Sequence, residues 1–402
     1  MKRLIRSIPL MFLIALMLLL QTACGSESEN VLSENNYPAY ANNEDIVDTD
    51  MPLDEIHAED EVQPPTYPIL EEDINLDNGT PTVAYFPRVD FDAIDFTSLI
   101  IPTDTPHGYI GHWYVRHIST YLPSRVPFTY RELDTALWIE QMLHAKGFDE
   151  SQVQMQIFSH YDVSGWENYF GRETPGLSYI KQQGWHDGHI ARGYSQNIIL
   201  TIPGQSTQTI IIGAHYDSLR YTGTSDNASG TSLLMENAQR MLANDNYYTL
   251  VYVFFGAHEI GMLGTFYFYE SLLPEDRENI VLYINADVLI EGPTLAISIG
   301  YDFQLNTNAL SEHMKVIVES FSDTHGIEIA TSWGITGGDQ LLFLYKGYTT
   351  LAFWGVCPVN FSNFLHSPKD SYEYISSRFP GMVENAMNAF ALLLETVLLE
   401  KF

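Results

Sequence analysis

Cysteine is nearly absent from this 402-residue chain, which contains only Cys24 and Cys357. Cys24 ends a segment typical of export signals, so its removal or modification leaves Cys357 without an internal disulfide partner. This scarcity excludes a small domain held together by several disulfides. Stability must come from packing, with bound metal as a second source.

Basic residues are also few, since 19 Lys and Arg stand against 51 Asp and Glu, which gives a net charge of −32. Such an acidic chain is not expected to bind nucleic acid. Hydrophobic residues make up 45% of the chain and aromatic residues 13%, which is enough for a large core in one or two domains.

The first 24 residues, MKRLIRSIPLMFLIALMLLLQTAC, combine a basic start with an apolar run over 8–20. This run is short for a membrane-spanning helix, and the pattern is that of an export signal. The last four residues resemble the lipobox of bacterial lipoproteins, although Gln21 stands where that box prefers leucine. A lipid anchor on Cys24, at the outer face of the cytoplasmic membrane, is favoured over free secretion.

Residues 25–82 are predicted to be a disordered tether. Residues 25–80 hold sixteen Asp or Glu and no Lys or Arg, together with scattered Pro, Asn and Ser. We therefore expect three parts: a signal over 1–24, a tether over 25–82 and a catalytic domain over 83–402.

The third part alternates between short apolar runs and amphipathic stretches, which predicts an α/β fold with a mostly parallel central sheet and helices on both faces. Helices are expected at 131–146, 230–243, 308–321 and 381–400. Strands are expected at 197–202, 209–214, 249–255, 280–286, 294–300 and 349–355. Several of these strands are apolar nearly throughout, as is typical of strands covered on both faces.

Three of the expected strands end at polar side chains. The first leads into His215 and Asp217, the second into His258 and Glu259, and the third into Asp287. Ligand-binding and active sites of open α/β sheets lie beyond the carboxyl ends of the strands. Three strand ends with polar side chains therefore indicate a functional site rather than three unrelated loops. The earlier segment 160–196, which breaks the alternation, contains His186, Asp187 and His189, but their spacing fits no strong metal signature and an ordinary surface loop is expected there.

Without usable thiolates, a zinc site in this chain must be built from His, Asp and Glu. The candidate ligands are His215, Asp226, Glu259, Asp287 and His366. They suffice for two ions if one carboxylate bridges them, and two such ions can activate water for amide hydrolysis. A helical H-E-x-x-H motif is excluded, because the residue three positions after Glu259 is methionine.

Six ordered motifs carry a resemblance to a known family. They are GAHYDS (213–218), SDNASGTSLLMENAQRML (225–242), GAHEIGMLGT (256–265), INAD (284–287), GGDQLLF (337–343) and LHSPKDSYEYI (365–375). Together they resemble metallopeptidase family twenty-eight over about residues 130–400. The resemblance implies a phosphorylase/hydrolase-like fold, two Zn²⁺ per chain, peptide substrates and aminopeptidase activity.

The resemblance also implies the role of each matching residue. His215 looks like a ligand of one zinc, Glu259 like a ligand of one ion and Asp287 like a ligand of the other. His366 looks like the last imidazole ligand, and Asp226 like the bridging carboxylate. Asp217 looks like the carboxylate that fixes a nearby imidazole. Because glutaminyl cyclases of this family are expected to lack the first histidine, His215 argues against that activity.

His258 departs from the family pattern, which has a glutamate at this position as the general base. Histidine also exchanges protons near neutral pH, and two adjacent cations should keep it deprotonated. Three roles stay open: His258 is the proton acceptor, it binds a metal, or it marks a site with slow turnover. The alternatives to an aminopeptidase are therefore a peptide-binding lipoprotein derived from a peptidase and, less favoured, a glutaminyl cyclase.

Overall fold

The computed structural model describes residues 88–159, 194–219, 221–331, 337–357 and 364–402. The predicted signal and tether and most of the segment 160–196 lie outside the described residues. All described residues belong to one compact unit, Tyr67–Phe402.

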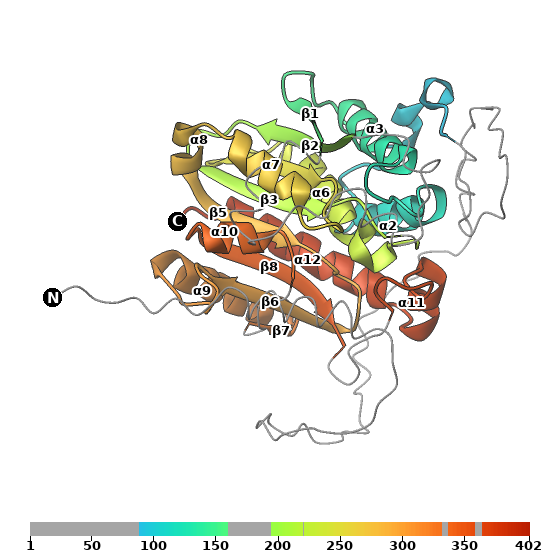
Figure 1. Ribbon diagram of the computed structural model, residues 1–402. Helices are drawn as coiled ribbons and strands as arrows, with labels where there is room; N and C mark the ends of the chain where they lie inside the picture. Colours follow the sequence, from blue (N-terminus) through green and yellow to red (C-terminus); the bar gives the residue numbers. More distant parts are fainter. Residues whose placement is uncertain (1–87, 160–193, 220, 332–336, 358–363) are drawn as a thin grey trace, which may run out of the picture. The chain divides into compact units, whose positions relative to one another are not determined.

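Eight strands form a single sheet in the order β1-β2-β4-β3-β5-β8-β6-β7 (Figure 1). The strands are β1 (Val153–Ser159), β2 (Tyr194–Ile202), β3 (Thr209–His215), β4 (Thr249–Phe255), β5 (Ile280–Ala286), β6 (Thr294–Gly300), β7 (Ile329–Ala330) and β8 (Thr350–Val356). The central strands β4, β3, β5 and β8 run parallel to their neighbours in that group. Antiparallel pairings join β1 to β2, β2 to β4 and β8 to β6. The predicted α/β class is confirmed. The sheet is mixed, with a parallel centre, antiparallel pairings on both sides of it, and a parallel pairing of β6 with the edge strand β7.

Nine α-helices and three short helical turns accompany the sheet in the described part of the chain. The helices are α2 (Tyr109–Tyr121), α3 (Tyr130–Ala145), α6 (Ser229–Met241), α7 (Leu263–Ser271), α8 (Pro274–Asn279), α9 (Ala309–His325), α10 (Gln340–Tyr345), α11 (Tyr372–Arg378) and α12 (Met382–Leu399). The turns are η1 (Phe91–Ala93), η2 (Phe96–Leu99) and η3 (Thr224–Ala228).

Local sequence signals fix several helix ends. Thr129 caps α3 by accepting a hydrogen bond from the amide of Glu132. Asn308 and Ser311 exchange hydrogen bonds in a capping box at the start of α9. The same helix ends at Gly326, whose φ of 65° lies in the left-handed region that glycine adopts without a steric penalty.

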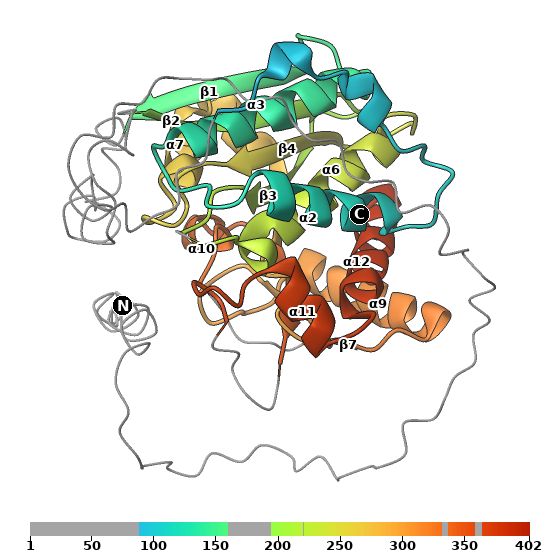
Figure 2. The same ribbon diagram turned by 90° about the vertical axis from the view of Figure 1, so that its right-hand side faces the viewer.

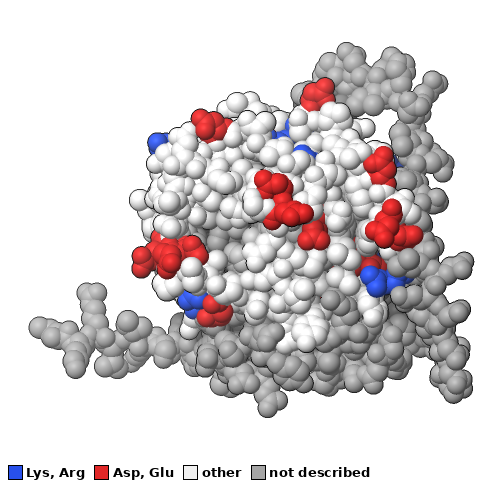
Figure 3. All heavy atoms as spheres, turned by 90° about the horizontal axis from the view of Figure 1, so that it is seen from above, with Lys and Arg blue, Asp and Glu red and all other residues white. Residues whose placement is uncertain are grey.

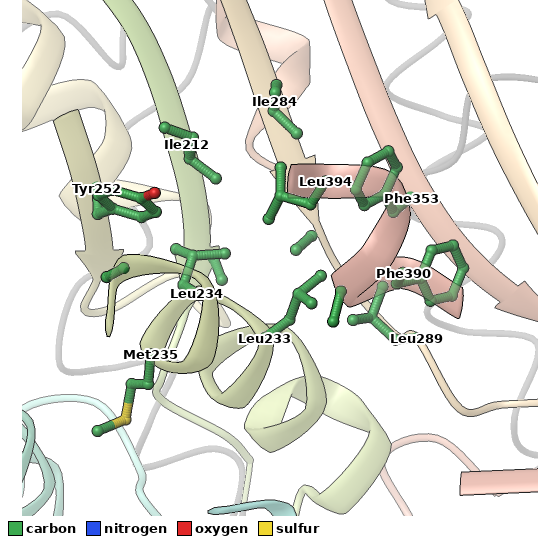
Figure 4. Packing of buried hydrophobic residues seen from close by; sticks show 14 of the residues in the cluster. Ile212, Leu233, Leu234, Met235, Tyr252, Ile284, Leu289, Phe353, Phe390 and Leu394 are labelled. Carbon is green, nitrogen blue, oxygen red and sulfur yellow. The ribbon is translucent and has the colours of Figure 1, made fainter. Parts of the chain in front are cut away.

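Helices cover both faces of the sheet, as Figure 2 shows. The alternation of side chains along β5 separates the two faces, because successive residues point to opposite sides. Tyr283 stacks on Phe343 of α10, at 3.8 Å between ring centroids. Its neighbour Ile284 points to the other face, toward α6 and α12 (Figure 4).

The main core lies on the face covered by α6 and α12. In Figure 4, Leu233 and Leu234 of α6 and Phe390 and Leu394 of α12 meet the side chains of the central strands. Phe353 of β8 stacks on Phe390 with centroids 5.4 Å apart. Burial of these apolar side chains is the main contribution to the stability of the fold.

Helix α12 combines length with an apolar composition. It is the one helix among the described residues that is long and apolar enough to cross a membrane, and 61% of it is buried inside the domain. Its buried side chains belong to the main core, so its composition is accounted for by packing.

Acidic side chains on the face seen in Figure 3 are scattered over the described residues. On the face seen in Figure 3, Asp and Glu side chains form separate groups with uncharged residues between them, and Lys and Arg are fewer.

Candidate metal centre

Three neighbouring parallel strands bring the predicted ligands to one edge of the sheet. β3 ends at His215, β5 is followed at once by Asp287, and β4 is followed, after two intervening residues, by His258 and Glu259. Because β3 pairs with both β4 and β5 in parallel, their carboxyl ends lie side by side. The topology, rather than proximity in the sequence, therefore assembles this site.

A first group of donor atoms consists of His215, His258 and Asp287, one atom of each lying within 4.8 Å of the others. The Nε2 atom of His215 is 3.3 Å from Oδ1 of Asp287. Both atoms are buried and have no hydrogen-bond partner within the described part of the chain. Buried polar atoms are almost always satisfied, so this pair points to a ligand.

A second group consists of Asp226, Glu259 and His366, whose donor atoms also lie within 4.8 Å of one another. The Nε2 atom of His366 is 2.8 Å from Oδ2 of Asp226 and 3.3 Å from Oε2 of Glu259. A small pocket opens over this group and is lined by Leu219, Tyr221, Gly223, Asp226, Glu259, His366 and Asp370.

Asp226 joins the two groups. Its Oδ1 lies 3.2 Å from Nε2 of His215, while its Oδ2 faces His366. The turn Thr224–Ala228 places this side chain by departing from helical geometry at Asp226 and Asn227, directly before α6 begins. One carboxylate thus offers an oxygen to each side, as a bridging ligand would.

His258 lies flat against His215, with ring centroids 3.9 Å apart and an angle of 8° between the ring planes. The lone pair of an imidazole nitrogen lies in the plane of its ring, so two parallel rings do not direct lone pairs at one ion. The opposite nitrogen, Nδ1 of His258, lies 2.9 Å from Oδ1 of Asp339. In this arrangement the ring of His258 does not point at an ion held by His215, although it belongs to the first group by distance. His215, Asp226 and Asp287 form the set that can share an ion.

The carboxylate of Asp217 supports the backbone next to these residues. Its two oxygens accept hydrogen bonds from the amides of His258 and Glu259, each at 3.0 Å. Its own carbonyl oxygen lies 3.1 Å from Nδ1 of His215, while the carboxylate is 3.7 Å from that nitrogen. The contact nearest to His215 is therefore made by the main chain of Asp217.

The backbone at the site adopts sparsely populated conformations. Ala257 and Val288 both have a φ of 51°, and His366 has a φ of 53°. Left-handed geometry is unfavourable for residues with a Cβ atom, above all for a β-branched valine. Such positions concentrate at functional sites, where the surrounding structure holds them in place.

Buried charges surround the predicted metal ligands. The guanidinium of Arg125, fully buried, donates to the carbonyl oxygens of Tyr216, Leu122, Thr222 and Gly223. Burial lowers its pKa to about 10, against the raising effect of nearby carboxylates.

Two further buried carboxylates hold the loops of the site. Asp370 accepts hydrogen bonds from the amides of Ser225 and Asp226, and burial raises its pKa to about 7. Glu132 accepts from the amide of Ala257, and burial raises its pKa well above the usual range.

The carboxylates create a strongly negative environment for the imidazoles. Burial has the largest single effect on the pKa of His258 and lowers it, but the charge and hydrogen bond of Asp339 together with the charge of Asp287 raise the pKa to about 9. Burial also lowers the pKa of His366, but the charges and hydrogen bonds of Glu259 and Asp226 together raise it to about 12. An excess of negative charge at buried positions favours a divalent cation.

The donor set fits zinc. Imidazole nitrogen and carboxylate oxygen are zinc ligands, and unpartnered buried atoms face one another across the first group. His215, Asp226 and Asp287 would hold one ion, and Asp226, Glu259 and His366 the other.

Sequence reasoning gave no role to Asp339, Asp370 or Arg125, although the first two lie within motifs quoted above. The sequence signal was a polar side chain at the end of an apolar strand. Asp339 and Asp370 do not stand at strand ends, because they precede α10 and α11. Arg125 lies before α3 and has no recognisable metal-binding pattern around it. Only the packing of the folded chain reveals these contacts.

Comparison with known proteins places the site in a family. The model of Peptidase family M28 matches residues 197–391, which contain all five predicted ligands. "Leucine aminopeptidase 1" of Colletotrichum graminicola is 26% identical over 287 residues, covering 62% of this chain and 69% of that protein. The chain spans 54% to 69% of the length of the curated relatives it matches.

Solved structures share the fold. BSAP, a zinc aminopeptidase from Bacillus subtilis, superposes with a TM-score of 0.57 at 16% identity, covering 73% of this chain and 95% of that one. Tannerella forsythia glutaminyl cyclase superposes with a TM-score of 0.53 at 14% identity, covering 74% and 100%. The family model covers the strand ends that form the site, so over residues 197–391 this chain is similar to peptidase family M28.

Proposed function

We propose that this chain is an extracytoplasmic, zinc-dependent exopeptidase that removes residues from the amino end of peptides. The observation that carries the proposal is the position of Asp226, which lies between His215 on one side and His366 on the other. This arrangement suits a pair of ions that share one carboxylate. The name of the leucine aminopeptidase relative supports the choice of the amino end.

When bound, two zinc ions would polarise the scissile carbonyl and lower the pKa of the attacking water. The protein must also accept a proton from that water and return it to the leaving amine. His258 is placed for this task, since it stacks on His215 without pointing at the ion that His215 would hold. The pocket over the second group, walled by Leu219 and Tyr221, would receive the substrate end.

The proposed location depends on the N-terminal segment. An export signal over 1–24 with a lipid attached to Cys24 would place the domain outside the cytoplasm at the end of its acidic tether. Free peptides in that space would be the substrates. Labelling of the protein with a radioactive fatty acid in a bacterial host, compared with Cys24→Ser, tests the anchor.

The activity is tested by hydrolysis of leucine p-nitroanilide by the zinc-loaded purified protein. We expect two zinc ions per chain and turnover in the parent, and a fall in kcat of about 10²- to 10⁴-fold in His258→Ala. An inert parent whose activity appears only in His258→Glu would instead support a peptide-binding lipoprotein. Ring formation from amino-terminal glutamine without peptide cleavage would support a glutaminyl cyclase.

A further inference from the structure

A buried carboxylate beside the metal centre has no part in holding an ion. Asp339 directly precedes α10 and is fully buried. Its Oδ1 accepts a hydrogen bond from the hydroxyl of Thr265 and lies 2.9 Å from Nδ1 of His258. Its Oδ2 is buried without a hydrogen-bond partner in the described residues. Burying a carboxylate is costly, so its contact with His258 requires an explanation.

The turn before α10 fixes Asp339 relative to the ligands. A Cβ atom on Gly338 would lie 3.1 Å from Oδ2 of Asp287 and 3.1 Å from the indole of Trp354. The glycine therefore packs closely against a ligand of the first group. Asp339, the next residue, is held at a set position beside that group.

This contact selects one form of the His258 ring. An ionised carboxylate only accepts hydrogen bonds, so the nitrogen that faces it must carry a proton. With Nδ1 protonated, the neutral imidazole has its free lone pair on Nε2. Stacking on His215 restricts rotation of the ring, so the two nitrogens keep their distinct surroundings.

We propose that Asp339 is a positioning residue that keeps Nδ1 of His258 protonated and leaves Nε2 as the proton acceptor of the reaction. The inference rests on the proposed peptidase function. It explains how histidine can take the place of a carboxylate. The two oxygens of a carboxylate are chemically equivalent, whereas an imidazole in the wrong tautomer presents a donor where an acceptor is needed.

The test begins with the tautomer, which can be observed without turnover. In the zinc-loaded full chain labelled with ¹⁵N-histidine, the signal of His258 is identified by its loss in His258→Ala. We expect Nδ1 to be protonated in the parent. In Asp339→Asn the side-chain amide can donate to Nδ1, so we expect that nitrogen to lose its proton. An unchanged Nδ1 in Asp339→Asn overturns the proposal.

Kinetics with leucine p-nitroanilide then test the consequence for the reaction. Asp339→Asn is expected to lower kcat by about 10²-fold or more with KM nearly unchanged, because proton transfer and not binding is impaired. In a His258→Ala background the same substitution should lower kcat no further, since the two residues act as one unit. Equal effects in both backgrounds contradict the proposal.

Zinc content separates positioning from ligation. We expect Asp339→Asn to retain two zinc ions per chain. Loss of one ion from this variant would mean that His258 is a ligand, and the proposal would fall. Asp134→Asn is the matched control, because Asp134 is also a buried carboxylate with a basic partner, Arg88, on a different part of the fold. This control should leave the tautomer and kcat unchanged.

The outcomes for function and for positioning are distinguishable. Suppose that the parent cleaves no peptide, but the tautomer of His258 differs between the parent and Asp339→Asn. This result refutes the peptidase function and, with it, the role of His258 and Asp339 in catalysis. A parent that cleaves peptides but keeps its tautomer and kcat in Asp339→Asn leaves the peptidase function standing and refutes only the positioning role.

Discussion

Gly230 in the first turn of α6 packs directly against the carbonyl oxygen of Ala286 at the end of β5. A Cβ atom there would approach that oxygen closer than 3.0 Å, and backbone at the end of a central strand cannot move aside easily. Alanine normally stabilises a helix by about 1 kcal/mol relative to glycine. At position 230 we expect alanine to destabilise the protein relative to glycine.

Gly230→Ala should lower the free energy of unfolding by about 1–3 kcal/mol, the typical cost of overpacking. It should also weaken zinc binding, because Asp226 lies one turn earlier and Asp287 follows Ala286. Urea unfolding and competition with a zinc-binding dye measure the two effects. Gly337→Ala is the control, since a Cβ atom there would meet no other atom within 4 Å and the residue has no left-handed φ. Equal costs at the two glycines would contradict this account.

Zinc stoichiometry should distinguish the shared ligand from a ligand of one ion. Asp226 faces both imidazoles, whereas His366 contacts only the second group. We expect Asp226→Ala to retain no tightly bound zinc and His366→Ala to retain one ion per chain, as measured by atomic emission after gel filtration. Retention of two ions by Asp226→Ala would show that the groups are independent.

The buried guanidinium of Arg125 is expected to be indispensable for stability. Arg125→Met would leave carbonyl oxygens of the loop after β3 without their donors. Breaking such a buried charged network costs about 3–5 kcal/mol, which urea unfolding can measure. Arg378→Met, at an exposed position of α11, should change stability by no more than about 0.5 kcal/mol. A small effect at both positions would argue against the role of Arg125.

His117 is predicted to make the domain sensitive to acid. It is buried between Trp113 and Trp138, with ring centroids 4.6 Å and 5.1 Å away, and burial lowers its pKa to about 3. Between about pH 6.5 and 3 the unfolded chain therefore binds a proton that the folded chain does not. Stability contributed by the neutral ring is present above about pH 6.5 and is lost as the pH falls.

The test compares the metal-free parent with His117→Phe, which keeps an aromatic ring between the tryptophans but cannot be protonated. At pH 4.5 the parent should have lost about 2–3 kcal/mol more than the variant relative to pH 8, since one pKa unit corresponds to about 1.4 kcal/mol. Parallel curves of unfolding free energy against pH would contradict the prediction.

The elements that could be predicted from the sequence are those with strong local signals. The apolar runs of β4, β5 and β6 match the expected ranges, and α3, α6 and α12 begin within two residues of their predicted starts. β7 has two residues, too few for a pattern, and β1 alternates polar and apolar residues at an edge of the sheet. Helix α2 is preceded by Gly108, which has no side chain to cap it, so the sequence contains no capping signal for this helix.

The site could be predicted in part for the same reason. His215, Glu259 and Asp287 follow apolar strands, and parallel pairing brings them together. Sequence position says nothing about which side chains face one another across the site. The contact between His258 and Asp339 spans 81 residues and depends on the packing of α10 against the sheet. It could not be inferred from spacing.

The two ligand groups differ in their contact with solvent. In the second group the side chain of His366 is 40% exposed, whereas His215 and Asp287 of the first group are exposed by no more than 4%. Exchange of an ion requires ligands to leave it one after another, and an exposed imidazole can swing into water without opening the core. The second position should therefore fill last and empty first, so that this protein would respond to zinc scarcity in its surroundings by passing through a long-lived form that carries a single, deeply seated ion.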